Sequence, residues 1–282
     1  MMACCLVNGQ SRGELSIADR GLRFGDGVFE TLAVVDGRPQ LWDAHIERLQ
    51  FGCERLGIPV PETETLWADW QALSDKATCG VLRITVTRGA GGVGYAPPVV
   101  CKPTRILQCL PVPERPDTLW ADGVDLRVCQ IRLAIQPVLA GMKHLNRLEQ
   151  VLARAECGSA GDGDGLLLAG DGRIAEATSA NLLIESEGTL IIPDITDVGV
   201  DGIMQQWIVE QAGAMGIVVR KKPMSLETLQ DKDAMMLCNS LNGVWPVRRL
   251  AGRKLSAPAL QSTLLARINE HRIALTPEVM GR

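Results

Sequence analysis

A lysine near the middle of the chain has surroundings that favour chemistry. Lys143 follows the nearly uncharged run 137–142, and apolar residues with helical spacing begin at Leu145. The predicted core face of this helix consists of Leu145, Leu148, Val151, Leu152 and Ala155. Lys143 then lies in or just before the first turn, where the helix dipole and desolvation both lower the pKa of an amine. A neutral lysine can form a Schiff base with a carbonyl, whereas the alternative is a solvated lysine without such a role.

Three further positions have groups suited to charged ligands. Gly202 opens a predicted helix over 202–216, and the free N–H groups at such an end can bind a phosphate. Arg48 offers a guanidinium fork that also suits a phosphate, and Glu176 lies between small residues where it could partner a buried cation. Each feature has an ordinary alternative: a capped surface helix, a solvated arginine, or a carboxylate facing water at a turn.

The composition is that of a globular protein with a sizeable core. The chain has 282 residues, of which 46% are hydrophobic and 22% charged, and its net charge is −4. No basic stripe points to nucleic acid, and no apolar run is long enough to span a membrane. The start lacks the pattern of a signal peptide, which favours a cytoplasmic protein. Nine cysteines without a Cys-x-x-Cys pair, and only three histidines, predict no metal site but reduced core thiols.

The elements expected before residue 112 are short strands and helices. Asp36-Gly37 is typical of a hairpin turn between 32–35 and 39–41. Asp43 is the predicted N-cap of a helix that ends at Gly57. Further elements are a helix over 63–77 and strands over 81–88 and 104–111.

The second half is richer in predicted strands and predicts an α+β fold. Strands are expected at 124–133, 165–169, 180–184, 189–193, 217–222 and 234–238, and a last helix at 257–270. The proline-rich run 111–116 is the best linker candidate. We therefore predict a small N-terminal α/β domain over 1–111, an interdomain linker over 112–123, and a larger strand-rich domain over 124–282 that carries Lys143.

Several motifs occur together in a specific order. They are FGDGVFET at 24–31, HIERL at 45–49, RGAGGVGY at 88–95, TRIL at 104–107, KHLNRLEQ at 143–150, EATSANL at 176–182, GIM at 202–204 and CNSL at 238–241. Their joint order and spacing resemble the fold-type IV pyridoxal-phosphate enzymes of the class IV aminotransferase family, and within it the 4-amino-4-deoxychorismate lyases. The resemblance runs from residue 8 to about residue 247.

This resemblance implies a cofactor and a set of site residues. The cofactor is pyridoxal 5′-phosphate, with Lys143 as the Schiff-base lysine and proton shuttle and Glu176 at the pyridine nitrogen. The implied phosphate ligands are Arg48, the backbone N–H groups of Ile203 and Met204, Asn239 and Ser240. The other implied contacts are Thr31 near the proton transfer, and Arg105 and Tyr95 with the substrate.

The implied reaction eliminates pyruvate from 4-amino-4-deoxychorismate and gives 4-aminobenzoate for folate synthesis, in a homodimer. Val93 and Gln205 stand where related lyases often carry arginine, which bears on the substrate more than on the cofactor. The nearest alternative is a fold-type IV aminotransferase for branched-chain or D-amino acids, although the D-amino acid enzymes usually carry tyrosine at the place of Phe29. A non-catalytic binding protein on the same fold is a remoter alternative.

Overall fold

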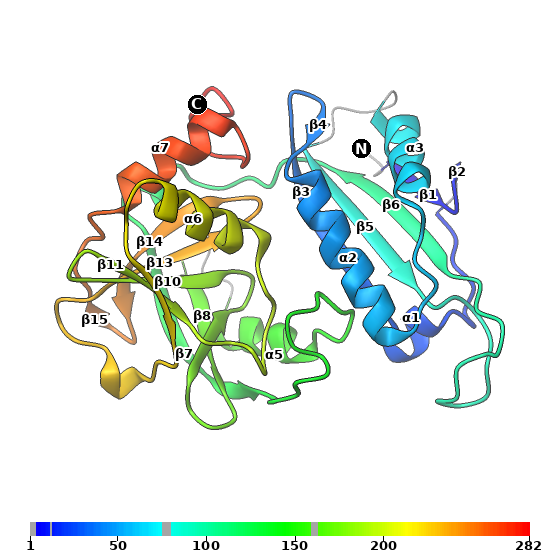
Figure 1. Cartoon of the computed structure of the whole chain (residues 1–282), viewed down its shortest axis with the longest axis horizontal. Coiled ribbons are helices and arrows are strands. Elements are labelled where there is room, and N and C mark those ends of the chain that lie inside the picture. The colour runs from blue at the N-terminus through cyan, green and yellow to red at the C-terminus, as the bar shows by residue number, and fades with distance from the viewer. Residues whose placement is uncertain (1–3, 12, 75–79, 159–162) are drawn as a thin grey trace. The chain divides into compact units, whose positions relative to one another are not determined.

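The chain forms two compact units (Figure 1). The computed structural model describes residues 4–11, 13–74, 80–158 and 163–282. Unit 1 comprises Met1–Pro113 and Met142–Asn146, and unit 2 comprises Glu114–Gly141 and Arg147–Arg282. The mixture of strands and helices in both units confirms the expected α+β class.

The boundaries of the two units differ from the predicted domains in two ways. The predicted linker 112–123 contains helix α4 (Thr118–Ala121), and its Leu119 and Trp120 are buried in the core of unit 2. Those residues therefore belong to a packed unit. The lysine segment 142–146 clusters with unit 1, because its backbone pairs with a strand of that unit. The expectation that the larger C-terminal domain contains Lys143 is corrected accordingly.

Unit 1 is built on a six-stranded antiparallel sheet with the order β2-β1-β6-β5-β3-β4. Its strands are β1 (Cys4–Val7), β2 (Gln10–Ser11), β3 (Gly27–Val35), β4 (Arg38–Pro39), β5 (Val81–Thr87) and β6 (Thr104–Leu110). The predicted hairpin is confirmed, since Asp36 and Gly37 connect β3 to β4 with φ angles of 51° and 71°. Positive φ at both central residues is what a two-residue type I′ turn requires.

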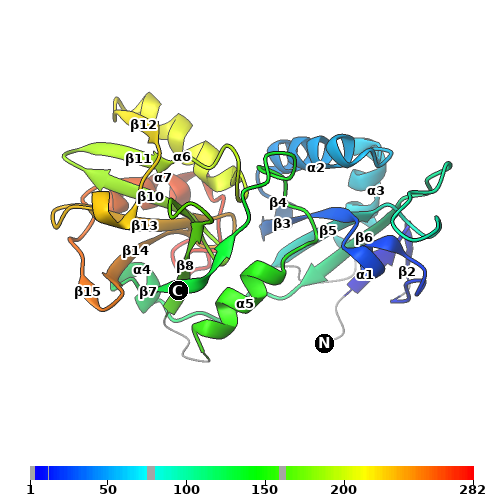
Figure 2. The same ribbon diagram turned by 90° about the horizontal axis from the view of Figure 1, so that it is seen from below.

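Helices cover one face of this sheet. They are α2 (Trp42–Leu56) and α3 (Thr63–Ser74), which lie on the same side of β3, β5 and β6, while the short α1 (Arg20–Phe24) precedes β3 (Figure 2). Gly57 ends α2 as predicted. Asp43 is not the N-cap, because the helix already begins at Trp42 after Leu41 in the left-handed conformation, and Asp43 lies in the first turn.

The two faces of β3 have different neighbours. Val28 and Leu32 point toward the helices and join the apolar core of unit 1. Side chains alternate along a strand, so Phe29 and Thr31 lie on the other face of the sheet, away from α2 and α3. Glu30 shares the helix-facing side and is fully buried there.

Unit 2 contains a nine-stranded mixed sheet with the order β12-β11-β10-β13-β14-β7-β8-β9, to which β15 adds beside β14. Its strands are β7 (Val124–Leu133), β8 (Gly163–Ala169), β9 (Ile174–Ala177), β10 (Asn181–Ser186), β11 (Thr189–Pro193), β12 (Val219–Lys222), β13 (Ala234–Asn239), β14 (Gly243–Leu250) and β15 (Arg253–Lys254). Strand β7 is parallel to β8 and β14, and β11 is parallel to β12. The sequence did not predict β9, β14 or β15.

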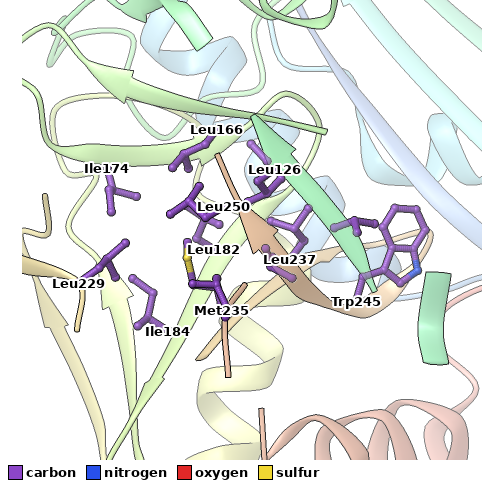
Figure 3. Close-up of a cluster of buried hydrophobic side chains, with 14 of the residues drawn as sticks. Leu126, Leu166, Ile174, Leu182, Ile184, Leu229, Met235, Leu237, Trp245 and Leu250 are labelled. Carbon is purple, nitrogen blue, oxygen red and sulfur yellow. The ribbon is translucent and has the colours of Figure 1, made fainter. Parts of the chain in front are cut away.

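A large apolar cluster holds unit 2 together (Figure 3). Labelled members include Leu126, Leu182, Leu237 and Trp245, which come from four strands that are neighbours or near neighbours in the sheet. Helices α6 (Ile203–Ala214) and α7 (Gln261–His271) pack against β10, β13 and β14. No helix in the described ranges has the length and apolar character needed to cross a membrane.

Helix α5 (Leu148–Glu156) differs from its prediction. It begins at Leu148, not at 145, and its Ala153 is buried. The expected core residues Leu148, Val151 and Leu152 are instead 75%, 59% and 54% exposed. The predicted core face is therefore wrong, because the apolar spacing describes a face that unit 2 leaves uncovered.

The cysteines in the described part of the chain are of two kinds. Six are free thiols: Cys5, Cys53, Cys101, Cys129, Cys157 and Cys238. Burial raises the pKa of Cys53 to about 12, which keeps its thiol protonated and inert. Cys109 is disulfide-bonded, so the expectation of a reduced thiol is wrong for this residue.

Candidate active site

The segment around Lys143 is an extended chain on the edge of β3. The N–H of Phe29 donates to the carbonyl of Lys143 at 2.9 Å, and the N–H of Leu145 donates to the carbonyl of Gly27 at 2.9 Å. Val28 and His144 form the bridge between these two hydrogen bonds. This pairing extends the chain, so Lys143 does not lie in the first turn of a helix. The helix-dipole argument for its reactivity is therefore wrong, and β3 fixes its position instead.

An aromatic ring supports the lysine side chain. The Nζ atom of Lys143 lies 4.7 Å from the centroid of the Phe29 ring. The guanidinium carbon of Arg83, from β5, lies 4.4 Å from the same centroid. Thr31 pairs with Arg83 across the two strands and shares the face of Phe29. The structure thus places Thr31 on the same side of the sheet as Phe29, together with Arg83, which sequence reasoning missed.

A buried ionic cluster lies on the opposite, helix-covered face. Arg48 of α2 donates from Nε to Oε1 of Glu30 at 2.8 Å and from Nη2 to Oε2 at 2.6 Å. His45, one turn earlier, contacts Oε2 of Glu30 through Nδ1 at 2.7 Å. Burial alone raises the pKa of Glu30, but Arg48 and His45 outweigh burial and hold that pKa at about 2. Glu30 is therefore a carboxylate at neutral pH, and it orients both side chains.

One ring nitrogen of His45 does not contact Glu30. Burial lowers the pKa of His45 more than Glu30 raises it, so the ring is neutral with its proton on Nδ1 toward Glu30. Its Nε2 atom is buried and has no hydrogen-bond partner within the described part of the chain. A buried, unpaired nitrogen next to an oriented arginine is a position where a polar ligand group gains hydrogen bonds. The cluster thus fits the predicted anion-binding role of Arg48, and it adds Glu30 and His45 to it.

Glu176 lies in β9 and not at a turn. Its Oε2 accepts the N–H of Val200 at 2.9 Å, and its Oε1 accepts from Nε2 of Gln150 at 3.2 Å. The side chain is buried in unit 2. Both carboxylate oxygens accept hydrogen bonds, so the side chain is fixed in one orientation.

The start of α6 has no side-chain cap. Gly202 is its N-cap and supplies no side chain to the first-turn N–H groups, which include those of Ile203 and Met204. A Cβ at this position would lie 1.8 Å from Oδ1 of Asn181. The side chains of Ile203 and Met204 are buried, and their backbone N–H groups stay the predicted phosphate ligands.

Asn239 and Ser240 lie at the turn between β13 and β14. The Oδ1 atom of Asn239 accepts the N–H groups of Leu241 at 3.0 Å and Asn242 at 2.8 Å, and its Nδ2 donates to the carbonyl of Ser179 at 3.1 Å. The Asn239 side chain therefore shapes the turn. Ser240, in the same turn, is half-buried and keeps its predicted role as a candidate phosphate ligand.

The predicted substrate contacts lie in different surroundings. Arg105 is in register with Val86 and Val28, hence on the helix-covered face, and its Nε donates to Asp69 of α3 at 2.9 Å. The sheet separates its face from that of Phe29. Tyr95 is 87% exposed, and its ring lies 5.4 Å from that of Phe24.

The two departures from the lyase pattern also have structural explanations. Val93 is exposed in the glycine loop, where it requires no buried partner. Gln205 is buried in α6, and its Nε2 donates to the carbonyl of Leu182 in β10 at 2.9 Å. Gln205 therefore ties the helix to the sheet.

The fold and these residues define a class of protein. The family model "Amino-transferase class IV" matches residues 27–250, and the chain belongs to this family. A solved relative of the same fold, a hypothetical aminotransferase from Mycobacterium tuberculosis, is described in a PLP-bound form; it has a TM-score of 0.80 at 23% identity, over 95% of this chain and 98% of that one.

Within the family, the chain is similar to lyases. Aminodeoxychorismate lyase of Vibrio harveyi is 36% identical over 243 residues, which cover 86% of this chain and 89% of the relative. The crystal structure of 4-amino-4-deoxychorismate lyase from Pseudomonas aeruginosa has a TM-score of 0.89 at 43% identity, over 94% of this chain and 98% of that one. A putative branched-chain-amino-acid aminotransferase of Methanocaldococcus jannaschii is 30% identical over 247 residues, 86% of this chain and 85% of the relative.

Proposed function

We propose that this chain is an aminodeoxychorismate lyase that uses pyridoxal 5′-phosphate to release pyruvate from 4-amino-4-deoxychorismate and form 4-aminobenzoate. The observation that carries the proposal is the similarity to two lyases at 36% and 43% identity over most of the chain. The lysine held on the Phe29 ring supports it, because the reaction needs an amine in a fixed position.

Each unit, taken by itself, has groups that suit part of the cofactor. In unit 1, the oriented Arg48 and the unpaired Nε2 of His45 suit an anionic, hydrogen-bonding ligand. In unit 2, the uncapped start of α6 and Ser240 suit a phosphate, and the Glu176 carboxylate suits a protonated pyridine nitrogen. When bound, the cofactor supplies an electron sink for the bond that breaks.

The chain's own groups then have distinct tasks. Glu176 is oriented by two hydrogen bonds, and it would hold the ring nitrogen of the cofactor. Lys143 takes a ring proton of the substrate at Nζ, and the Thr31 hydroxyl on the same face offers a polar contact to that transfer. The apolar ring of Phe29 restricts the positions that Nζ can take. Aromatisation of the product supplies much of the driving force.

Two assays test the proposal. The purified protein is given 4-amino-4-deoxychorismate and pyruvate is measured; then D-alanine or a branched-chain amino acid is given with 2-oxoglutarate and glutamate is measured. We expect pyruvate release at a rate far above transamination. Transamination without pyruvate release would instead assign the aminotransferase function of the Methanocaldococcus relative. We also expect Lys143→Ala to lose turnover, and substantial remaining activity would remove the lysine from its role.

We further propose that the working form is a homodimer. Helix α5 leaves Leu148, Val151 and Leu152 exposed along one face. Neighbouring exposed apolar residues of this kind are typical of interfaces between protein chains. A second copy of the chain is the proposed occupant of this face.

We place the enzyme in the cytoplasm. Six cysteines of the described residues are free thiols, which persist in a reducing compartment, and the disulfide at Cys109 is the exception to this pattern. Detection of the tagged chain in the soluble cell fraction, with these thiols open to alkylation after denaturation, is the expected result.

A further inference from the structure

Two cysteines of unit 2 lie side by side at the end of α5. Cys157 is the C-cap of this helix, and Cys129 belongs to β7. Their Sγ atoms lie 3.4 and 3.7 Å from the same acceptor, the carbonyl oxygen of Ala153, and the two side chains are also hydrogen-bond partners of each other. Both are free thiols. The fold therefore brings together two thiols that are far apart in the sequence.

A glycine of β8 leaves space for both sulfur atoms. A Cβ atom on Gly165 would lie 2.4 Å from Sγ of Cys129 and 2.9 Å from Sγ of Cys157, closer than real Cβ atoms come to their neighbours. These two distances add to 5.3 Å, which is the upper limit for the separation of the two sulfur atoms. In a disulfide the sulfur atoms are about 2 Å apart, so they need to approach by at most about 3.3 Å. A change of side-chain rotamer moves a sulfur atom by a comparable distance.

Glu156 fixes the backbone on both sides of this pair. The pairing of β7 with β8 shifts register at a bulge that contains Cys129. In this bulge the N–H groups of Gln130 and Ile131 donate to the two carboxylate oxygens of Glu156 at 2.7 and 3.0 Å. Because Glu156 directly precedes Cys157, these hydrogen bonds tie the end of α5 to the bulge. Groups held together in this way react with each other at a high effective concentration.

The two thiols differ in their access to solvent. Cys129 is only 1% exposed. Cys157 is half-buried and lines a surface pocket of unit 2, together with Arg127 and Asp164. A small reagent from solution can therefore reach Cys157 in the folded protein, whereas Cys129 is shielded from it.

The surroundings of the two thiols favour the same order of reaction. Burial raises the pKa of Cys129 to about 12, and nearby carboxylates act in the same direction. Burial raises the pKa of Cys157 as well, but its hydrogen bond with the other thiol and the charges of Arg154 and Arg127 oppose this rise. Because the thiolate is the reactive form, Cys157 reacts first and Cys129 second.

We propose that Cys129 and Cys157 form an intramolecular disulfide when the protein meets a peroxide, and that this bond joins the end of α5 covalently to β7. The pair is a site of reversible oxidation within unit 2. The inference goes beyond the proposed function and does not depend on it, because none of the residues proposed to act on the substrate takes part.

The reaction with hydrogen peroxide has two steps. The sulfur of Cys157 loses its proton and attacks one peroxide oxygen, so that an S–O bond forms, the O–O bond breaks, and a sulfenic acid and one water result. The sulfur of Cys129 then attacks the sulfenic sulfur; an S–S bond forms, the S–O bond breaks, and the leaving hydroxide takes the proton of Cys129 as a second water. The two thiols are oxidised and the peroxide is reduced.

Peptide mapping of the oxidised full chain provides the test. The protein is treated with a small excess of hydrogen peroxide at slightly alkaline pH, where more of the thiol is ionised. It is then alkylated in denaturant and digested with trypsin without reduction. Trypsin releases Cys129 in peptide 128–132 and Cys157 in peptide 155–173. We expect these two peptides to be joined by a disulfide that dithiothreitol cleaves.

Two variants separate this disulfide from general thiol oxidation. In Cys129→Ala the link should be lost, and Cys157 should remain as a sulfenic acid that dimedone traps. Cys101→Ala is the matched control, because Cys101 is another half-buried free thiol, in unit 1, and its loss should leave the link unchanged.

Other outcomes would overturn the proposal. It fails if peroxide leaves both wild-type thiols open to alkylation, or if dimedone traps Cys157 in the wild type as fully as in Cys129→Ala. Linkage of Cys157 to other cysteines as often as to Cys129 would equally contradict it. If Cys129→Ala does not fold, the wild-type peptide map decides alone. Absence of pyruvate release would overturn the proposed function without changing this map.

Discussion

Glu30 is the side chain on which the ionic cluster of unit 1 depends. It accepts from Arg48 and His45 together, and its side chain is 1% exposed. The motif HIERL suggested Arg48 from its residue type, and its helical spacing puts His45 on the same side. Nothing in the sequence pattern distinguished Glu30 from a residue on the outer face of β3, because alternation gives two faces without saying which one a helix will cover.

Glu30→Gln should therefore destabilise the fold. The change removes the charge that compensates a buried arginine, and breaking a buried pair on one side costs about 3 kcal/mol. Urea unfolding measures the free energy. The control is Glu187→Gln, which removes an exposed pair with Lys232 and should change the stability by less than about 1 kcal/mol. Equal losses of unfolding free energy in the two variants would show that the buried pair contributes no more to stability than the exposed pair.

The same carboxylate makes the stability depend on pH. Its pKa in the folded protein is about 2, against 4.5 in the absence of structure, so the folded state favours the ionised form. This contribution is complete above about pH 5 and is lost as pH falls from there toward 2. The stability difference between wild type and Glu30→Gln should shrink over that interval. A constant difference from pH 6 to pH 3 would mean that ionisation of Glu30 is not its source.

At the scale of elements, the sequence predicts those helices and turns that have clear local signals. The prediction fails where contact with another element determines the local structure. The Asp36-Gly37 hairpin, the end of α2 at Gly57 and the start of α6 near Gly202 are confirmed because turns and caps are encoded locally. The lysine segment was expected to be helical, yet it pairs with β3. Backbone pairing with a strand that is distant in the sequence cannot be predicted from the spacing of apolar residues.

The start of α6 gives a prediction at this scale. In Gly202→Ala, the new Cβ would lie 1.8 Å from Oδ1 of Asn181, so the helix end or the asparagine must move. We expect a loss of stability of about 1 to 3 kcal/mol and weaker binding of inorganic phosphate, measured by urea unfolding and calorimetry. Gly213→Ala, in the same helix, is the control: its Cβ meets nothing within 4 Å, and helix propensity should make it neutral or stabilising. Unchanged phosphate affinity in Gly202→Ala would remove this helix end from the anion site.

At the scale of the whole chain, the resemblance of ordered motifs identified more than any single physical signal. The local argument for Lys143 rested on a helix end that is not there, yet the family that the ordered motifs indicated is correct, since the class IV family model spans 27–250. The order and spacing of the motifs along the chain identify the family whatever the local structure is. The argument from the helix dipole, by contrast, depended on Lys143 lying at a helix start. The three apolar residues exposed on α5 were missed as a surface for a similar reason, because periodicity alone cannot separate a core face from an interface between chains.

That exposed face carries the prediction for the assembled molecule. Replacing Leu148 and Val151 together by serine should convert a dimer to a monomer, because each copy would lose two apolar contacts at the same symmetric surface. The monomer should keep its far-ultraviolet circular dichroism, since both residues are more than half exposed in the single chain and contribute little to its core. Sedimentation velocity measures the state, and Val218→Ser, an exposed residue outside α5, is the control that should remain dimeric. A wild type that sediments as a monomer at micromolar concentration, or a double variant that stays dimeric, would mean that α5 is covered by something other than a second copy.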